Sequence, residues 1–169
     1  MVLSSAAQRV QAALQEQGFS AQVKELPEST RTASQAARAA GCEVSQIVKS
    51  LVFRGKTSGH PVLVETSGAN RVSEPKLAVL AGEPVEMADP AFVREQTGYS
   101  IGGVPPLAHL RPILTLVDED LLLHRTIWAA AGTPNAIFEL TPSDLIRMTR
   151  GIVAAVKACT SGEEPAGRR

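Results

Sequence analysis

Residues 46–53 read Gln-Ile-Val-Lys-Ser-Leu-Val-Phe, and this short run is the clearest indication of how the middle of the chain folds. Its β-branched and aromatic residues predict a strand, with Lys49 and Ser50 at or just before its start. An ammonium buried without a partner is costly, so the charged end of Lys49 must reach water, a carboxylate or an anionic ligand. Lys49 is therefore either a strand-end lysine that extends into solvent or a lysine that binds phosphate in a cleft.

Further helices and strands are predicted on both sides of this run. Helices are predicted at 6–17 (capped by Ser5), 33–40 (capped by Thr32), 75–80, 90–97, 119–123 and from Pro142 onward, with a helical turn at 45–48. Strands are predicted at 21–26, 47–53, 60–66, 113–117, 126–130 and 136–140. Because helices and strands are intermixed and short turns join several strands, we expect one α+β domain with a mixed or antiparallel sheet.

Length and composition fit one ordinary globular domain. The chain has 169 residues, of which 44% are hydrophobic and 20% are charged. It contains 17 basic and 17 acidic residues, so its formal net charge is zero. This balance excludes a polybasic protein that holds nucleic acid by bulk electrostatics, but it leaves a local basic patch open.

Cysteines and histidines are few and scattered. Cys42 and Cys159 lie far apart and form no Cys-x-x-Cys pair, and the histidines stand singly at positions 60, 109 and 124. Neither a zinc site nor a disulfide scaffold is expected, and no metal or cofactor is predicted. Cys42 is interpreted as a packing residue without a lowered thiol pKa.

Several classes of protein lack their signatures here. The sequence has no Gly-x-Ser-x-Gly, His-Glu-x-x-His or Gly-x₄-Gly-Lys-Ser/Thr motif, which disfavours a serine hydrolase, a metalloprotease and a P-loop enzyme. It shows no signal-peptide pattern and no run of 18 apolar residues, so a cytoplasmic protein is expected. Residues 1–159 are predicted to form the domain, and residues 160–169 a disordered tail.

Two glycine-rich loops are candidate binding elements. Residues 102–106 read Gly-Gly-Val-Pro-Pro, in which the glycine N–H groups could hold a carbonyl or an oxyanion, although a structural turn is the simpler interpretation. The loop 132–135 is interpreted as a turn. Asp118 is predicted to cap the short helix that follows it, and His109 and Arg111 either contact phosphate or face solvent.

Four segments in order resemble a known family. Residues 32–41 read Thr-Ala-Ser-Gln-Ala-Ala-Arg-Ala-Ala-Gly, residues 46–53 are quoted above, residues 99–106 read Tyr-Ser-Ile-Gly-Gly-Val-Pro-Pro, and residues 130–134 read Ala-Ala-Gly-Thr-Pro. Together they resemble the YbaK/ProX family of aminoacyl-tRNA deacylases, whose domain is also inserted in bacterial prolyl-tRNA synthetases. The resemblance implies a mixed, partly barrel-like sheet surrounded by helices.

The resemblance also implies roles for individual residues. Lys49 matches the family lysine that holds the phosphate of the terminal adenosine, and the loop 102–106 matches the one whose backbone contacts the aminoacyl carbonyl. Gly132 matches the glycine of a further loop beside the pocket. The predicted catalytic residues are Lys49, Gly102 and Gly103, and the predicted substrate-binding residues are Ser50, Val104, Pro105, Pro106 and Gly132.

The implied reaction is hydrolysis of the ester between a wrong amino acid and the 3′ end of a tRNA. Because this ester is already activated, a positioned water or a substrate group suffices as nucleophile, with backbone stabilisation of the oxyanion. Cysteinyl-tRNA deacylases have threonine at the Ser50 position and a Ser-Pro, lysine-rich loop in place of residues 102–109, which weakens the case for a cysteinyl substrate.

Three functional hypotheses remain at this point. The first is a free-standing hydrolase that acts in trans on a mischarged tRNA-Pro and contacts its acceptor end, with a synthetase as a further candidate partner and no membrane. The second is a non-catalytic module that binds an aminoacyl-tRNA end, a nucleotide or a synthetase. The third is a hydrolase of unrelated small esters on the same scaffold.

Overall fold

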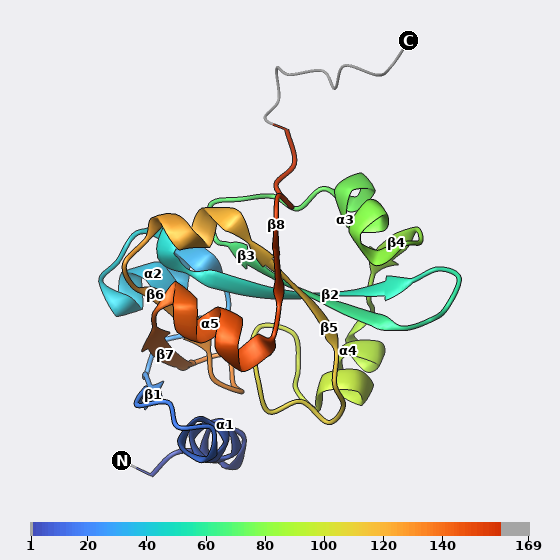
Figure 1. The fold of residues 1–169 in the computed structure, drawn as a ribbon. Helices are drawn as coiled ribbons and strands as arrows, with labels where there is room; N and C mark the ends of the chain where they lie inside the picture. The colour runs from blue at the N-terminus through green and yellow to red at the C-terminus, as the bar shows by residue number, and fades with distance from the viewer. Residues whose placement is uncertain (1, 160–169) are drawn as a thin grey trace.

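The computed structural model describes residues 2–159, so the tail predicted at 160–169 lies outside the described residues. Helices and strands alternate irregularly along the chain, and helices pack around two sheets (Figure 1). The predicted α+β class is confirmed. Within residues 2–159, no helix combines the length and the apolar character needed to cross a bilayer.

Two sheets form the centre of the fold. The larger has the order β4-β2-β3-β5-β8, with β2 antiparallel to β3 and β4 and with β5 parallel to β3 and β8. Its strands are β2 (Val48–Gly55), β3 (Pro61–Ser67), β4 (Val85–Met87), β5 (Leu114–Asp118) and β8 (Ile152–Ala154). The smaller, antiparallel sheet has the order β1-β7-β6, formed by β1 (Lys24–Glu25), β6 (Ile127–Ala130) and β7 (Ala136–Leu140). A bridge between Ile47 and Trp128 links the sheets, and barrel-like closure stays unconfirmed.

Helices begin and end at strong local signals. They are α1 (Ser5–Glu16), α2 (Ala33–Ala40), η1 (Val44–Gln46), α3 (Glu74–Ala81), α4 (Pro90–Thr97), η2 (Glu119–Leu123) and α5 (Pro142–Thr149). Thr32 and Gln35 form a reciprocal capping box on α2, as predicted. The cap predicted for α1 is wrong by one residue: Ser4 caps it, because its hydroxyl accepts from the Ala7 N–H while its own N–H donates to Glu25.

The strand predictions differ from the structure mainly at short elements. The strands predicted at 47–53, 60–66, 113–117, 126–130 and 136–140 are present with ends shifted by at most two residues. The strand predicted at 21–26 shrinks to the two residues of β1, and the helical turn at 45–48 is the 3₁₀ turn η1. The edge strands β4 and β8, three residues each, were not predicted.

Residues of β2 alternate between the two faces of the larger sheet. Val52 packs into the main core between the two sheets, whereas Phe53 packs into a smaller core with Leu77 of α3. Because neighbouring residues of a strand point to opposite sides, Ser50 faces the main core and Lys49 faces the other side. The first residues of β2 therefore present different chemistry on each face.

Candidate functional site

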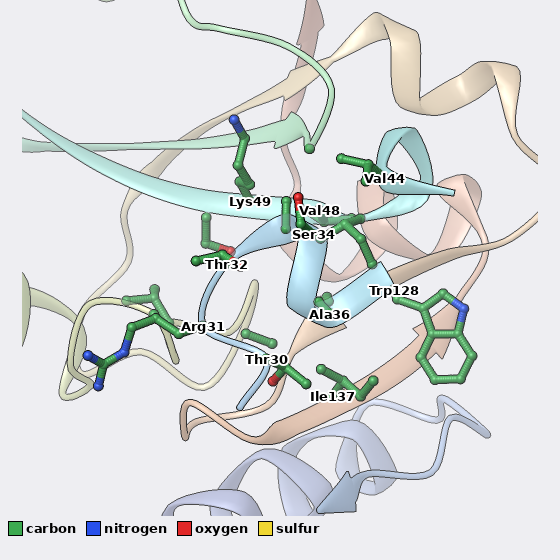
Figure 2. A pocket seen from close by; sticks show the side chains of 18 of the residues that line it. Thr30, Arg31, Thr32, Ser34, Ala36, Val44, Val48, Lys49, Trp128 and Ile137 are labelled. Atoms are coloured by element: carbon green, nitrogen blue, oxygen red, sulfur yellow. The ribbon is translucent and has the colours of Figure 1, made fainter. Parts of the chain in front are cut away.

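A cavity of about 430 Å³ opens between several segments of the chain that lie far apart in the sequence. The loop before α2, the start of β2, the loop at 101–104 and strand β6 all contribute to its lining (Figure 2). Polar side chains come from Thr30, Arg31, Thr32 and Ser34, and apolar ones from Val48, Trp128 and Ile137. The volume is in the range of small-molecule sites, and its mixture of apolar walls with few polar groups is typical of them.

Half of the predicted site residues meet at this cavity. Lys49, Ser50, Gly102 and Val104 line it, although the two pairs are about fifty positions apart in the sequence. The other predicted residues, which are Gly103, Pro105, Pro106 and Gly132, are absent from its lining. Pro106 instead lines a separate depression beside His109.

The Lys49 side chain is held at one edge of the cavity. Its Nζ donates to the backbone oxygen of Asn70 at 2.7 Å, and Figure 2 shows the chain leaving β2 away from Thr30 and Ile137. Burial lowers the pKa of Lys49, and the nearby Asp118 carboxylate opposes that shift. An ammonium has three donors, so two stay available for an anion. Lys49 is thus a fixed cation with spare hydrogen-bonding capacity.

A buried network fixes the Asn70 carbonyl that holds Lys49. Asp118 Oδ2 accepts from Thr66 Oγ1 at 2.9 Å, from the Ser67 N–H at 3.0 Å and from Asn70 Nδ2 at 2.8 Å. The predicted cap is also confirmed, because Asp118 Oδ1 accepts from the Asp120 N–H. Sequence reasoning found the cap and missed the network, which depends on the register of β3 and β5.

Ser50 has an acidic partner that the sequence analysis also missed. Ser50 Oγ donates to Glu65 Oε2 at 2.7 Å, and the two residues lie directly opposite each other in β2 and β3. Glu65 is fully buried, which raises its pKa to about 8, while the Ser50 hydrogen bond acts in the opposite direction. The signal was present in the sequence, because Glu65 is the one acid in the run Pro-Val-Leu-Val-Glu-Thr-Ser.

The two adjacent glycines of the loop at 101–104 do different things. Gly102 has φ +92° and lies against Arg31, since a Cβ there would sit 2.8 Å from Arg31 Cγ. Its N–H has no hydrogen-bond partner among residues 2–159. Gly103 is buried against the backbone of Thr133, and its carbonyl accepts from the Gly132 N–H at 2.9 Å. Gly102 therefore lines the cavity and has an unpaired N–H, whereas Gly103 and Gly132 join two loops.

Two further residues considered in the sequence, His109 and Cys42, are partly buried. His109 Nε2 lies 2.6 Å from the Pro105 carbonyl, and burial lowers the pKa of His109 while that hydrogen bond opposes the shift. Burial and the carboxylates of Glu139 and Glu43 raise the pKa of the half-buried Cys42 thiol, as expected for a packing residue. In the described part of the chain, no group of three or more His, Cys, Asp or Glu side chains is placed to hold a metal ion.

The sequence assigns a chain with this fold and cavity to a known family. The sequence model of the aminoacyl-tRNA editing domain matches residues 27–148, so the chain belongs to the aminoacyl-tRNA editing domain family.

Three similar proteins illustrate what the chain resembles. Protein YwhH of Bacillus subtilis (strain 168) is 35% identical over 123 residues, which cover 73% of this chain and 78% of that protein. A protein of Enterococcus faecalis (strain ATCC 700802 / V583), named "Putative Cys-tRNA(Pro)/Cys-tRNA(Cys) deacylase EbsC", is 29% identical over 74% of this chain and 76% of its own length. A solved structure named "Crystal structure of a putative trans-editing enzyme for prolyl tRNA synthetase" is 50% identical, with a TM-score of 0.88 over 94% of this chain and 100% of that one.

Proposed function

We propose that this protein acts in trans to hydrolyse the ester bond of mischarged aminoacyl-tRNA, with a mischarged tRNA-Pro as its substrate. The observation that carries the proposal is the pairing of two groups at one cavity: the Lys49 ammonium with spare donors, and the free N–H of Gly102. Membership of the editing domain family and the names of its similar proteins support the reaction class. We also propose a cytoplasmic location, because the proposed substrate is a tRNA.

Each end of the substrate has a suitable partner in this proposal. Lys49 binds the phosphate of the terminal nucleotide, since a compact, fixed cation suits a phosphate. The Gly102 N–H donates to the ester carbonyl, and more strongly to the oxyanion that forms on attack. A donor used in this way typically contributes about 3 kcal/mol to the transition state.

The nucleophile in this proposal is a water molecule or a group of the substrate. The described residues that line the cavity include neither a cysteine, the usual thiol nucleophile, nor a histidine, the usual base for a serine or cysteine nucleophile. The Ser50 hydroxyl is hydrogen-bonded to Glu65 instead. An aminoacyl ester needs little activation, and positioning with oxyanion stabilisation is sufficient for its hydrolysis.

The zero net charge of the chain supports a small contact area with the tRNA. Broad contact with a polyanion would need an excess of basic residues, whereas this chain has equal numbers of both signs. The acceptor end is therefore the proposed partner, and a synthetase that supplies further affinity is compatible with it.

A deacylation assay on a panel of charged tRNAs tests the proposal. Separately prepared tRNAs carrying alanine, cysteine, serine or proline are incubated with the wild-type protein, with Lys49→Ala and with Lys56→Ala. Lys56 is an exposed lysine in the turn after β2 and serves as the matched control. We expect rapid loss of one mischarged species, which Lys49→Ala slows about 10- to 100-fold and Lys56→Ala leaves unchanged. Binding of a charged tRNA without hydrolysis of any species would replace the proposal with the non-catalytic module.

A further inference from the structure

Glu65 is the one buried side chain in residues 2–159 with an oxygen that lacks any hydrogen-bond partner. Its Oε2 accepts from Ser50 Oγ at 2.7 Å, but its Oε1 is enclosed without a donor. No lysine, arginine or histidine of the described chain forms an ion pair with it. A buried carboxylate with a missing partner is expensive, so this site favours the neutral carboxylic acid.

The neighbours of Glu65 offer no charge that would change this preference. On β5 its register partner is Val117, while Asp118 and Lys49 project from the opposite face of the sheet, where both are hydrogen-bonded. Strand β6 and the 3₁₀ turn η1 carry no ionisable side chain. On η2, Glu119 is exposed and Asp120 is bonded to Asn70. Among residues 2–159, the Ser50 hydroxyl is the one hydrogen-bond partner of the Glu65 carboxyl group.

A neutral Glu65 can share a proton with Ser50 in two ways that leave the heavy atoms unchanged. In the first, Ser50 donates to Oε2, and the acid proton on Oε1 is a buried donor without an acceptor. In the second, Oε2 carries the proton and donates to Ser50 Oγ, which leaves only a carbonyl oxygen unpaired. Unpaired buried carbonyl oxygens are tolerated more often than unpaired donors, so the second arrangement is favoured.

The second arrangement changes what Ser50 presents to the cavity. Because Ser50 Oγ accepts from Glu65, its own proton is free to point into the space that Ser50 lines with Lys49 and Gly102. The hydroxyl then binds an oxygen, such as the ester carbonyl. With Glu65 ionised, the same proton is committed to Oε2, and the cavity meets only lone pairs, which suit an ammonium group.

We propose that Glu65 is a positioning residue: in its neutral form it donates to Ser50 Oγ and thereby turns the Ser50 hydroxyl proton toward an oxygen of the aminoacyl ester. The inference rests on the proposed deacylase function and adds two residues to its substrate recognition. The raised pKa of Glu65, about 8, keeps the neutral form dominant at neutral pH.

The pH dependence of single-turnover deacylation tests this role. We compare the wild type with Glu65→Gln, whose amide can donate to Ser50 Oγ at every pH, between about pH 6 and about pH 10. The wild-type rate divided by the Glu65→Gln rate should be constant at low pH, fall through a midpoint near the pKa of Glu65, and level off about tenfold lower, because ionised Glu65 removes only the one hydrogen bond that Ser50 donates. Glu86→Gln, an exposed acid on β4, is the matched control and should follow the wild type.

Ser50→Ala, alone and combined with Glu65→Gln, tests whether Glu65 affects the deacylation rate through Ser50. Ser50→Ala should slow deacylation about tenfold at pH 7, the size of one good hydrogen bond. In that background Glu65→Gln should no longer alter the pH profile, because the group that it orients is gone. A constant rate ratio across the pH range, an inactive Glu65→Gln enzyme at pH 7, or a full Glu65→Gln effect without Ser50 would each overturn the proposal.

A second measurement does not depend on catalysis. The ¹³C signal of the Glu65 carboxyl group, assigned by its loss in Glu65→Gln, should titrate near pH 8 rather than near 4.5. A midpoint near 4.5 with tRNA hydrolysis intact would overturn the positioning role and leave the proposed function standing. Absence of hydrolysis from every tRNA would overturn both.

Discussion

Two polar groups lie on opposite faces of β2, one residue apart, and they are built differently. Lys49 belongs to a network in which Asn70 and Asp118 have several hydrogen bonds each. Ser50 belongs to a pair in which the Glu65 carboxyl group is left with one oxygen unpartnered. Several hydrogen bonds to each supporting group hold the Lys49 charge in one place, whereas an incompletely bonded acid leaves the position of its proton free. The two faces therefore supply a fixed cation and an adjustable hydroxyl to one cavity.

Removing the acid at the centre of the bonded network should have the largest effect. Asp118→Ala leaves the Thr66 hydroxyl, the Ser67 N–H and the Asn70 amide without their acceptor. We expect the free energy of unfolding to fall by about 3–5 kcal/mol, measured by urea denaturation. The neighbouring exposed acid gives the control, and Glu119→Ala should change stability by less than about 0.5 kcal/mol. Equal effects of the two substitutions would show that the network contributes nothing.

Glu65, the acid with one unpartnered oxygen, should instead make the free energy of unfolding depend on pH. Glu65 has a folded-state pKa of about 8 against an ordinary value of 4.5, so between these values the folded state binds one more proton than the unfolded state. The wild type should therefore lose stability relative to Glu65→Gln by about 1.4 kcal/mol per pH unit across this window, and the loss should end above it. Unfolding in urea at several pH values measures the difference. Parallel curves for the two proteins would contradict a neutral Glu65.

Two glycine substitutions, one beside the cavity and one remote from it, distinguish the effect of backbone strain from an effect on the cavity. Gly102→Ala and Gly82→Ala both place a side chain at positive φ, and this backbone strain alone should cost each about 1 kcal/mol of stability. A Cβ at Gly82 meets nothing within 4 Å, whereas one at Gly102 meets Arg31 beside the cavity. Deacylation should fall in Gly102→Ala and persist in Gly82→Ala when both variants are assayed in their folded state. An equal loss of rate in both would mean that general destabilisation, rather than the cavity, explains it.

Local elements of this fold are predictable because their signals are local. Thr32 and Gln35 define the start of α2, and Asp89, Pro90 and Gly98 define both ends of α4, where sequence and structure agree. The three-residue edge strands β4 and β8 carry no such signal, since their pairing is set by neighbours that come from elsewhere in the chain.

The site was predictable only in part, for the same physical reason. Lys49 stands out as a charge in an apolar run, and Gly102 as part of a glycine-proline loop. The Ser50–Glu65 pair depends on the register between β2 and β3, which a sequence does not reveal. Arg31 lies beside Gly102 only because two distant loops meet. The substrate roles of all the predicted site residues stay predictions, and four of these residues do not line the cavity: Gly103, Pro105, Pro106 and Gly132.

The most direct test of the proposed function takes the mischarged tRNA-Pro that the panel shows to be hydrolysed and compares its single-turnover deacylation by the wild type, Lys49→Ala and Lys56→Ala. Loss of a charge-assisted hydrogen bond to phosphate should slow Lys49→Ala about 10- to 100-fold at subsaturating protein. Lys56→Ala should match the wild type, because Lys56 lies outside the cavity lining. Hydrolysis at the wild-type rate by Lys49→Ala would contradict the account of this cavity as the site where the acceptor end is held.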